Sequence, residues 1–263
     1  MVRYQMSKPR IAGEIVGIGL DSRVAILRSD KTRVLKYCNA ENKDAVRALK
    51  KEQEVLAILQ HHSRITHLHA ICEEGSIFEY YPHGSLRNYY GSLPALPALN
   101  DRLRWCQQAV EGIAYVHSNN ILHNDISARN ILLASDFTIK LCDFGNSIVL
   151  DEEMVRARLE TEEGTVETAE TRYNRARVVE GRKPCVADDI FAIGSLLFEI
   201  LTGKVPYHDL DSTEVENRYE NGSFPDIEGI IPACAMIIEH CWRNQYKSIR
   251  EIEDDIRLIA VEI

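Results

Sequence analysis

The chain has 263 residues, of which 45% are hydrophobic and 27% charged, and its formal net charge is −9, from 31 basic against 40 acidic residues. A chain of this length buries a substantial core, either as one large domain or as two small ones. The acidic balance argues against general binding to nucleic acids or anionic membranes, which need a basic surface. No apolar run approaches the roughly 20 residues of a membrane span.

The cysteines indicate a cellular compartment. The seven cysteines are dispersed and form no C-x-x-C pair. Such a set is typical of buried thiols in a reducing compartment, rather than of a disulfide framework or a zinc site. The N-terminus has no signal-like segment, so we expect a cytoplasmic protein, with a nuclear one as the alternative. Nothing in the sequence reports an oligomeric state.

The first eighty residues predict mainly strands. Short apolar runs bounded by turn-forming residues predict strands at 11–16, 24–27, 33–38 and 76–80. One helix interrupts them, at about residues 42–60, where Ala, Leu, Lys and Glu are frequent.

After Pro82-His83-Gly84 the pattern becomes mostly helical. Apolar side chains at helical spacing share one face of a predicted helix, and these are Leu103, Cys106, Val110 and Ile113, followed by His117. A strand pair follows at 131–133 and 139–142, then a long polar stretch at 151–170 and an apolar helix at 190–201. A sheet-rich part joined by a Pro/Gly hinge to a helical part predicts two lobes, with a ligand-binding cleft between them.

Two glycines lie between the first two predicted strands. Gly17 and Gly19 would let the backbone approach the phosphates of a ligand closely, with N–H groups as donors. On its own this G-x-G is better explained by a simple hairpin turn. The position of a third glycine in the usual G-x-G-x-x-G is taken by Ser22.

A lysine and a glutamate predict an ion pair. Lys36 ends an apolar strand, which by itself predicts only a solvated side chain. In the following helix, Glu52 lies three residues after Leu49, on the apolar face of that helix. A carboxylate there is costly unless a cation meets it, so we expect a Lys36–Glu52 pair that holds the lysine toward phosphate oxygens. Glu54 lies on the other side of the helix and is expected to be solvated.

The most specific pattern is a pair of linked motifs. His123-Asn124-Asp125 is followed by Asn130, five residues after the aspartate, and Asp143-Phe144-Gly145 begins thirteen residues after that asparagine. This arrangement resembles the catalytic and metal-binding loops of protein kinases. The resemblance runs from about Ile11 to Ile259.

The resemblance implies a role for each charged residue. Asp125 would orient the substrate hydroxyl and accept its proton, and Asn130 and Asp143 would hold Mg²⁺. Lys36 would contact the phosphates of ATP while it pairs with Glu52. Phosphoryl transfer needs this set because it depends on positioning and on neutralising the spreading charge.

The resemblance also implies a nucleotide site and a buried anchor. Phe78 would be the gatekeeper, and the backbone of residues 79–81 would face the adenine edge. The expected nucleotide-binding residues are Gly17, Gly19, Val24, Val34, Lys36, Phe78, Glu79, Tyr81 and Leu132. His123, Phe144 and Leu56 would form part of an internal hydrophobic spine, and Asp189 would anchor the catalytic loop.

The implied fold is α+β, a two-lobed protein kinase fold with a small antiparallel β-sheet N-lobe that holds one helix and a larger, mainly α-helical C-lobe. The domain would cover residues 1–263, with the N-lobe at about 1–81, the hinge at about 79–84 and the C-lobe at about 85–263. The chain resembles small, diverged kinase domains abundant in fungi, with a tyrosine-kinase-like catalytic loop, HNDISARN.

The chain departs from the family pattern in its catalytic loop. Asn124 replaces the arginine that normally docks a phosphorylated activation loop. We therefore expect little dependence on phosphorylation of the acidic 151–170 stretch, whose candidate sites are Thr161, Thr165 and Thr168. Ser127 replaces the lysine of serine/threonine kinases, and Arg129, placed as in tyrosine kinases, would supply the missing charge near the transferred phosphate.

A second departure lies in the substrate-positioning segment. Arg177 and Val178 stand where the proline and glutamate of A-P-E are expected, and Val34 replaces a small alanine above the adenine. Two hypotheses follow. The first is an ATP- and Mg²⁺-dependent protein kinase that acts on a protein substrate, with Ser/Thr favoured over Tyr. The second is an ATP-binding pseudokinase or signalling scaffold. A small-molecule phosphotransferase ranks last, because such enzymes generally carry a different second metal motif.

Overall fold

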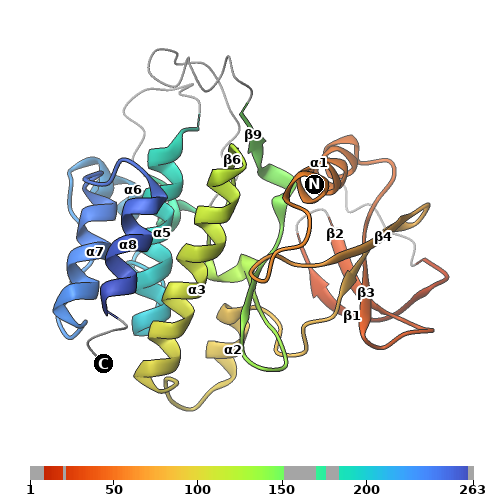
Figure 1. Cartoon of the computed structure of the whole chain (residues 1–263), viewed down its shortest axis with the longest axis horizontal. Coiled ribbons are helices and arrows are strands. Elements are labelled where there is room, and N and C mark those ends of the chain that lie inside the picture. Colours follow the sequence, from red (N-terminus) through yellow and green to blue (C-terminus); the bar gives the residue numbers. More distant parts are fainter. Residues whose placement is uncertain (1–8, 20–21, 151–169, 176–183, 260–263) are drawn as a thin grey trace.

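The computed structural model of the chain describes residues 9–19, 22–150, 170–175 and 184–259. Figure 1 shows two parts side by side, a sheet accompanied by one helix and a larger group of helices. The first part comes from the first eighty residues and the second from the rest of the chain. This is the two-lobed α+β arrangement that the change of hydrophobic pattern at Pro82 predicted.

The sheet of the first part has five antiparallel strands in the order β1-β2-β3-β5-β4. The strands are β1 (Ala12–Ile18), β2 (Ser22–Leu27), β3 (Arg33–Cys38), β4 (Leu68–Cys72) and β5 (Gly75–Glu79). The predicted strand at 33–38 has those bounds, and the other three predictions differ by one or two residues at an end. The register pairs Lys36 with Val24 on one side and with Ser76 on the other.

Strand β4 was not predicted. It lies at an edge of the sheet, and its three middle residues are exposed. An edge strand that buries neither face shows no alternation of apolar and polar residues, which is the signal for a strand.

The helix beside the sheet is α1 (Lys43–Leu59), one residue shorter at each end than predicted. Asn42 caps it, because the Asn42 side chain accepts hydrogen bonds from the N–H groups of Asp44 and Ala45. The buried face contains Glu52 together with four apolar residues, Ala45, Val55, Leu56 and Leu59. Leu49 is only half-buried, so the face is rotated slightly from the predicted one.

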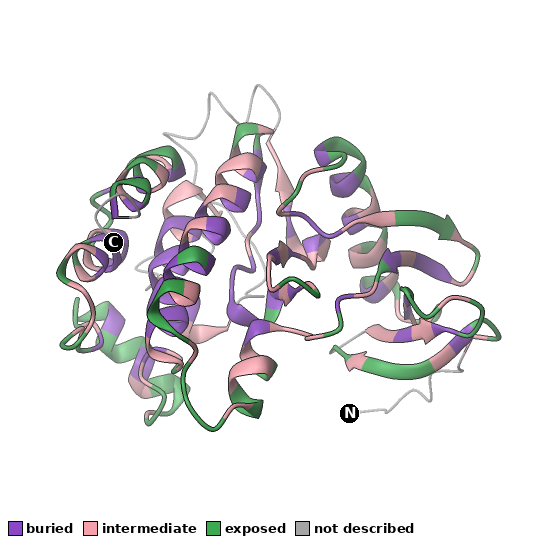
Figure 2. Ribbon diagram, turned by 60° about the horizontal axis from the view of Figure 1, so that its bottom comes forward, coloured by how far each residue is buried: buried purple, intermediate pink, exposed green. Residues whose placement is uncertain are grey.

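The second part is built around α5 (Val186–Thr202), in which every residue from Asp189 to Leu201 is buried. Figure 2 shows this burial at the centre of the helices, with exposed surface outside. The other helices are α2 (Leu86–Ser92), α3 (Leu99–Ser118), α6 (Ser212–Glu220), α7 (Pro232–Trp242) and α8 (Ile249–Ile259). Helix α5 begins four residues before the predicted start, because the Asp188 side chain accepts the Cys185 N–H at 2.8 Å.

Two pairs of short strands lie in the segment between α3 and α5. The predicted pair is present as β7 (Ile131–Leu133) and β8 (Ile139–Leu141). A second pair, β6 (Ile121–Leu122) and β9 (Ile148–Val149), was not predicted, because two-residue strands have no measurable periodicity. The strands β6 and β9 bracket the segment that carries both linked motifs.

Three of the cysteines, Cys106, Cys234 and Cys241, are buried in the core as free thiols. Within the described ranges, no helix is both long enough and apolar enough to span a bilayer.

The packing of α5 against α7 predicts the effect of a small substitution. A Cβ added at Gly194 would lie 2.7 Å from the Cys241 Cβ and 3.2 Å from the Ile238 carbonyl oxygen. Gly194→Ala should gain about 1 kcal/mol of helix propensity but lose about 1–3 kcal/mol through crowding. We expect a net loss in the free energy of unfolding, measured by urea denaturation.

Gly91→Ala on α2 is the matched control, because no heavy atom lies within 4 Å of the added Cβ. This variant should be neutral or more stable by about 0.4–1 kcal/mol. Equal responses of the two variants would contradict tight packing between α5 and α7.

Candidate active site

A buried lysine joins the sheet to the helical part. The Nζ atom of Lys36 lies 2.8 Å from Glu52 Oε2 and 2.8 Å from Asp143 Oδ1. The side chains of Lys36 and Glu52 are 14% and 2% exposed, so this predicted pair is present and lies away from water. Burial lowers the pKa of Lys36, but Glu52 and Asp143 outweigh it and hold that pKa above its ordinary value. Lys36 is therefore a fixed cation at the junction of the two parts.

The Asp143-Phe144-Gly145 segment lies directly beneath α1. Phe144 is fully buried, its N–H donates to Glu52 Oε1 at 3.3 Å, and its ring centroid lies 4.8 Å from that of His123. A Cβ at Gly145 would lie 3.2 Å from both the Cβ and the carbonyl oxygen of Ala48, so a glycine permits this close approach. The charge of Lys36 holds the pKa of Asp143 below its usual range. The Asp143 side chain remains 47% exposed, so it can reach a ligand.

Asp189, at the start of α5, holds the catalytic loop. One of its oxygens accepts the N–H of His123 at 2.8 Å, and the other accepts the N–H of Asn124 at 2.9 Å. A third contact was not expected, because the Nε2 atom of His117 on α3 lies 2.8 Å from Asp189 Oδ2. Burial opposes ionisation of Asp189, but the contacts with His117 and the loop hold its pKa below the ordinary value.

Asp125 lies at the centre of this loop. Its side chain is buried, and its Oδ1 atom has no hydrogen-bond partner among the described residues. Burial raises the pKa of Asp125 above its ordinary value, although His123 opposes the shift. Asn130 donates its side-chain N–H to the Asp125 backbone oxygen at 2.8 Å, which fixes the two residues relative to each other. An unpartnered, buried carboxylate oxygen is suited to accept a proton from a ligand.

Asn124 is uncharged, whereas the family pattern has an arginine at this position. Its backbone has a φ of 61°, a left-handed conformation that asparagine tolerates better than most residues. Its side-chain amide donates to the Asn146 carbonyl oxygen at 3.2 Å. This links the catalytic loop to the end of the Asp143-Phe144-Gly145 turn without offering a charge to a phosphate.

The residues expected around adenine lie on the facing strands. The register places Val34 opposite Phe78, and both are buried, whereas Val24 and Leu132 are half-buried. Val34 and Lys36 are two residues apart on β3, so their side chains share a face of the sheet. The residues expected to contact the base and the phosphates therefore lie along one side of the sheet.

In the 79–81 segment at the end of β5, two of the three backbone N–H groups are already hydrogen-bonded, which leaves one to contact the adenine. The N–H groups of Glu79 and Tyr80 donate to His67 and Thr32 carbonyl oxygens at 3.0 and 2.8 Å. Among the described residues, no hydrogen bond occupies the N–H of Tyr81. The Tyr81 side chain turns inward instead, where its hydroxyl accepts the His67 N–H at 3.1 Å. The Tyr81 amide is thus the available donor of the 79–81 segment.

The two glycines of G-x-G lie at the end of β1. Gly17 pairs with Val24, and a Cβ there would lie 3.2 Å from the Val24 Cβ. The N–H of Gly19 donates to the Ser22 carbonyl oxygen at 2.9 Å. This hydrogen bond joins the end of β1 to the start of β2, and residues 20–21 lie outside the described residues.

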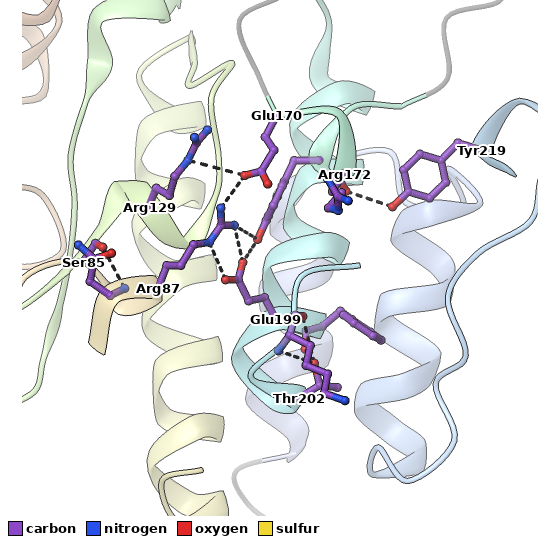
Figure 3. Close-up of polar contacts among 12 residues, drawn as sticks. Ser85, Arg87, Arg129, Glu170, Arg172, Glu199, Thr202 and Tyr219 are labelled. Carbon is purple, nitrogen blue, oxygen red and sulfur yellow. Dashed lines mark hydrogen bonds and ion pairs between the residues drawn. The ribbon is translucent and has the colours of Figure 1, made fainter. Parts of the chain in front are cut away.

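A polar network near the catalytic loop was missed by sequence reasoning. Arg87 on α2 donates two hydrogen bonds of 2.8 Å to Glu199 on α5, from Nε and Nη2, and its Nη1 atom donates to Glu170 (Figure 3). The Nη2 atom also donates to the Tyr173 hydroxyl at 3.0 Å. Burial raises the pKa of Glu199, although Arg87 opposes the shift. A signal was available for Glu199, because it is the one carboxylate within the apolar run that the sequence predicted as a helix at 190–201. No local pattern could have identified its partner 112 residues away.

Some predicted residues lie outside the described part of the chain. These are Arg177 and Val178 of the substrate-positioning segment and the candidate phosphosites Thr161, Thr165 and Thr168. Arg129, expected near the transferred phosphate, is described, and its side chain is 51% exposed.

The residues present fit magnesium and a nucleotide phosphate. Mg²⁺ takes oxygen ligands, commonly one or two carboxylates together with substrate phosphates and water. Asp143 uses one carboxylate oxygen for Lys36, and Asn130 uses its amide N–H for Asp125, so each keeps an oxygen available. Over the described ranges, no group of three His, Cys, Asp or Glu side chains is arranged to hold a metal. Phosphate oxygens and water would complete the coordination of a cation held by Asp143 and Asn130.

Comparison with known proteins agrees with this geometry. The family model for protein tyrosine and serine/threonine kinases matches residues 22–254. That range contains the sheet strands from β2 onward, Lys36, Glu52 and both linked motifs. The chain therefore belongs to the protein kinase family.

Several relatives are named serine/threonine-protein kinases. The probable serine/threonine-protein kinase gdt8 of Dictyostelium discoideum is 25% identical over 240 residues, which are 86% of this chain and 17% of the relative. A serine/threonine-protein kinase of Arabidopsis thaliana, STY46, is 28% identical over 71% of this chain and 32% of its own length. PrkC of Bacillus subtilis is 24% identical over 97% and 40%. The chain thus spans well under half the length of these relatives.

The Lys36–Glu52 pair predicts a difference between two glutamates on α1. Glu52→Gln keeps the size of the side chain but leaves Lys36 with Asp143 alone. We expect the free energy of unfolding to fall by about 1–3 kcal/mol, because a buried charged group loses its partner. Urea denaturation measures this change.

Glu54→Gln is the control on the same helix, because Glu54 is exposed and, among the described residues, its one ion pair is with Lys51. Its effect should stay within about 0.5 kcal/mol. Equal stability of Glu52→Gln and the wild type would show that the Lys36–Glu52 pair makes no net contribution.

Proposed function

We propose that this chain is an active kinase domain that transfers the γ-phosphate of ATP to a serine or threonine hydroxyl of a protein substrate, with Mg²⁺. The observation that carries the proposal is the arrangement of Lys36 between Glu52 and Asp143, beside the loop that holds Asp125 and Asn130. These five groups come from four separate segments and are fixed by buried contacts. A scaffold that did not transfer phosphate would have no need of an unpartnered, buried Asp125.

In this proposal the nucleotide lies between the sheet and the helical part. Val24, Val34, Phe78 and Leu132 contact the adenine, the Tyr81 N–H and the Glu79 carbonyl bind its edge, and the turn at Gly17 and Gly19 covers the phosphates. Lys36 contacts phosphate oxygens as a point charge. Asp143 and Asn130 hold Mg²⁺, which supplies neutralisation of the phosphate charge when it is bound.

The reaction transfers one phosphoryl group and one proton. The substrate hydroxyl oxygen forms a bond to the γ-phosphorus as the bond to the β–γ bridging oxygen breaks, and ADP leaves with that oxygen. Asp125 orients the hydroxyl and accepts its proton. Arg129 lies four residues after Asp125 and offers a cation to the transferred phosphoryl group. Fixed charges of this kind lower the barrier because they need no reorganisation during the reaction.

The preference for serine and threonine has support from the names of the relatives, all of which are serine/threonine-protein kinases. The sequence Ser127-Ala128-Arg129-Asn130 resembles tyrosine kinases instead. The similarity to these relatives extends over most of the chain, whereas the tyrosine-kinase-like motif has only four residues. We therefore favour serine and threonine as the acceptor residues. The proposed domain has its hinge at about residues 79–84 and acts in the cytoplasm.

The role of Asp125 predicts a separation of binding from transfer. Asp125→Asn removes the proton acceptor but leaves Lys36, Asn130 and Asp143 in place. We expect phosphotransfer to fall by at least about 100-fold, while the Kd for Mg²⁺–ATP changes by less than about threefold. The measurements are a radiolabelled-ATP assay with a peptide library and isothermal titration calorimetry.

Asp143→Ala serves as the reference for lost metal binding, because it should weaken Mg²⁺–ATP binding as well as transfer. Undiminished transfer by Asp125→Asn would rule out the assigned base. A wild-type chain that binds ATP but transfers no more phosphate than Asp143→Ala would instead be a pseudokinase. The same peptide library reports whether serine, threonine or tyrosine accepts the phosphate.

A further inference from the structure

Glu170 lies between two arginines from different parts of the chain. Its Oε2 atom is 2.6 Å from Arg87 Nη1 on α2 and 3.6 Å from Arg129 Nε in the catalytic loop (Figure 3). The Glu170 side chain is 20% exposed, so the contact is largely shielded from water. A carboxylate between two guanidinium groups attracts both of them, and here the contact with Arg87 is the shorter one.

The backbone of Glu170 is also fixed. Its carbonyl oxygen accepts the Tyr173 N–H at 2.8 Å and thereby starts the short 3-10 helix η3 (Thr171–Tyr173). The Tyr173 hydroxyl contacts both Arg87 and Glu199. The segment 170–173 is therefore tied to α2 and α5 through its backbone turn and two side chains.

Arg87 provides the rigid end of this arrangement. Its planar guanidinium bonds Glu199 through two nitrogens, a fork geometry that permits little rotation. Glu199 belongs to the fully buried stretch of α5. Because Arg87 is fixed by the core, Glu170 is fixed by Arg87, and the position of Glu170 does not depend on Arg129.

Arg129 is the exposed end of this arrangement. Its side chain is 51% exposed, and over the described ranges the one ion pair it makes is with Glu170. A long arginine side chain that is half in water loses up to about 2 kcal/mol of conformational entropy when it is held in one rotamer. Among the described residues, Glu170 is the group whose ion pair restrains the Arg129 side chain.

We propose that Glu170 is a positioning residue, which holds the Arg129 guanidinium beside Asp125 in the orientation needed for phosphoryl transfer. The inference rests on the proposed function and adds to it a residue outside the two linked motifs. The carboxylate is part of the chain itself, so the catalytic loop is ordered by a fixed internal anion that comes from the segment after residue 169.

A double-mutant cycle tests this inference. Glu170→Gln should lower kcat on the peptide chosen from the library by about tenfold, with the Kd for Mg²⁺–ATP unchanged within about twofold. In an Arg129→Gln background the same substitution should change kcat by less than about twofold, because Glu170 then has no arginine to position. Equal loss in the two backgrounds would overturn the inference.

Two further variants separate positioning from folding. Glu170→Asp keeps the charge and should have a higher kcat than Glu170→Gln. If only the size of the side chain mattered, Glu170→Gln would have the higher kcat of the two. Glu239→Gln on α7 removes a comparable glutamate, which pairs with Arg243 at 2.8 Å, and should leave kcat unchanged. A loss of kcat in Glu239→Gln equal to that of Glu170→Gln would contradict a specific role for Glu170.

A readout that needs no turnover distinguishes this inference from the proposed function. The Arg129 Nε–Hε signal in ¹⁵N NMR, assigned through Arg129→Lys, should show a rigid side chain in the wild type and a flexible one in Glu170→Gln. A rigid Arg129 in Glu170→Gln would overturn the positioning role. The wild-type chain could also show no phosphotransfer while Arg129 is still rigid and is released in Glu170→Gln. That outcome would overturn the proposed function but not the contact between Glu170 and Arg129.

Discussion

A buried carboxylate, Asp189, is the constraint on which the site depends. It lies at the start of the most apolar helix, where an ionised group is costly unless donors meet it. Its donors are two backbone N–H groups of the catalytic loop, from His123 and Asn124, and the ring of His117. Because both carboxylate oxygens are used by backbone groups, the loop can take few other positions without stranding the charge. The core of the helical part thereby determines where Asp125 lies.

A second buried charge links this loop to the sheet. Lys36 is shared between Glu52 on α1 and Asp143, and the N–H of Phe144 also donates to Glu52. A displacement of α1 would leave Lys36 with a single partner and Glu52 with none, both largely out of water. The two parts of the molecule are thus held together by the same groups that the proposed chemistry uses, so the described arrangement has the catalytic set assembled.

Much of the fold and the charged centre could be predicted from the sequence. The burial of Glu52 followed from its place on an apolar helical face, and that burial in turn required Lys36. The linked motifs indicated Asp125, Asn130 and Asp143. The edge strand β4 could not be predicted, because its exposed residues carry no periodic signal. His117 was treated as one more position on an apolar face, since a histidine there gives no sign of a distant carboxylate. The Arg87 network depends on tertiary contacts that local spacing does not encode.

The network around Arg87 is better suited to fixing positions than to adding stability. Buried ion pairs gain little net stability, because the cost of removing both charges from water offsets their attraction. From Glu199 to Arg87, Glu170 and Arg129, however, the charges alternate, and the side chain at one end, Glu199, is buried while that at the other, Arg129, is half-exposed. Each charge is restrained by the one before it, nearer the core. In such a series the buried helix α5 restrains a side chain at the surface of the catalytic loop. Asn124 in that loop is uncharged. Asp189 therefore holds the backbone of the loop from beneath, and the proposed role of Glu170 adds a restraint on Arg129 from beside it.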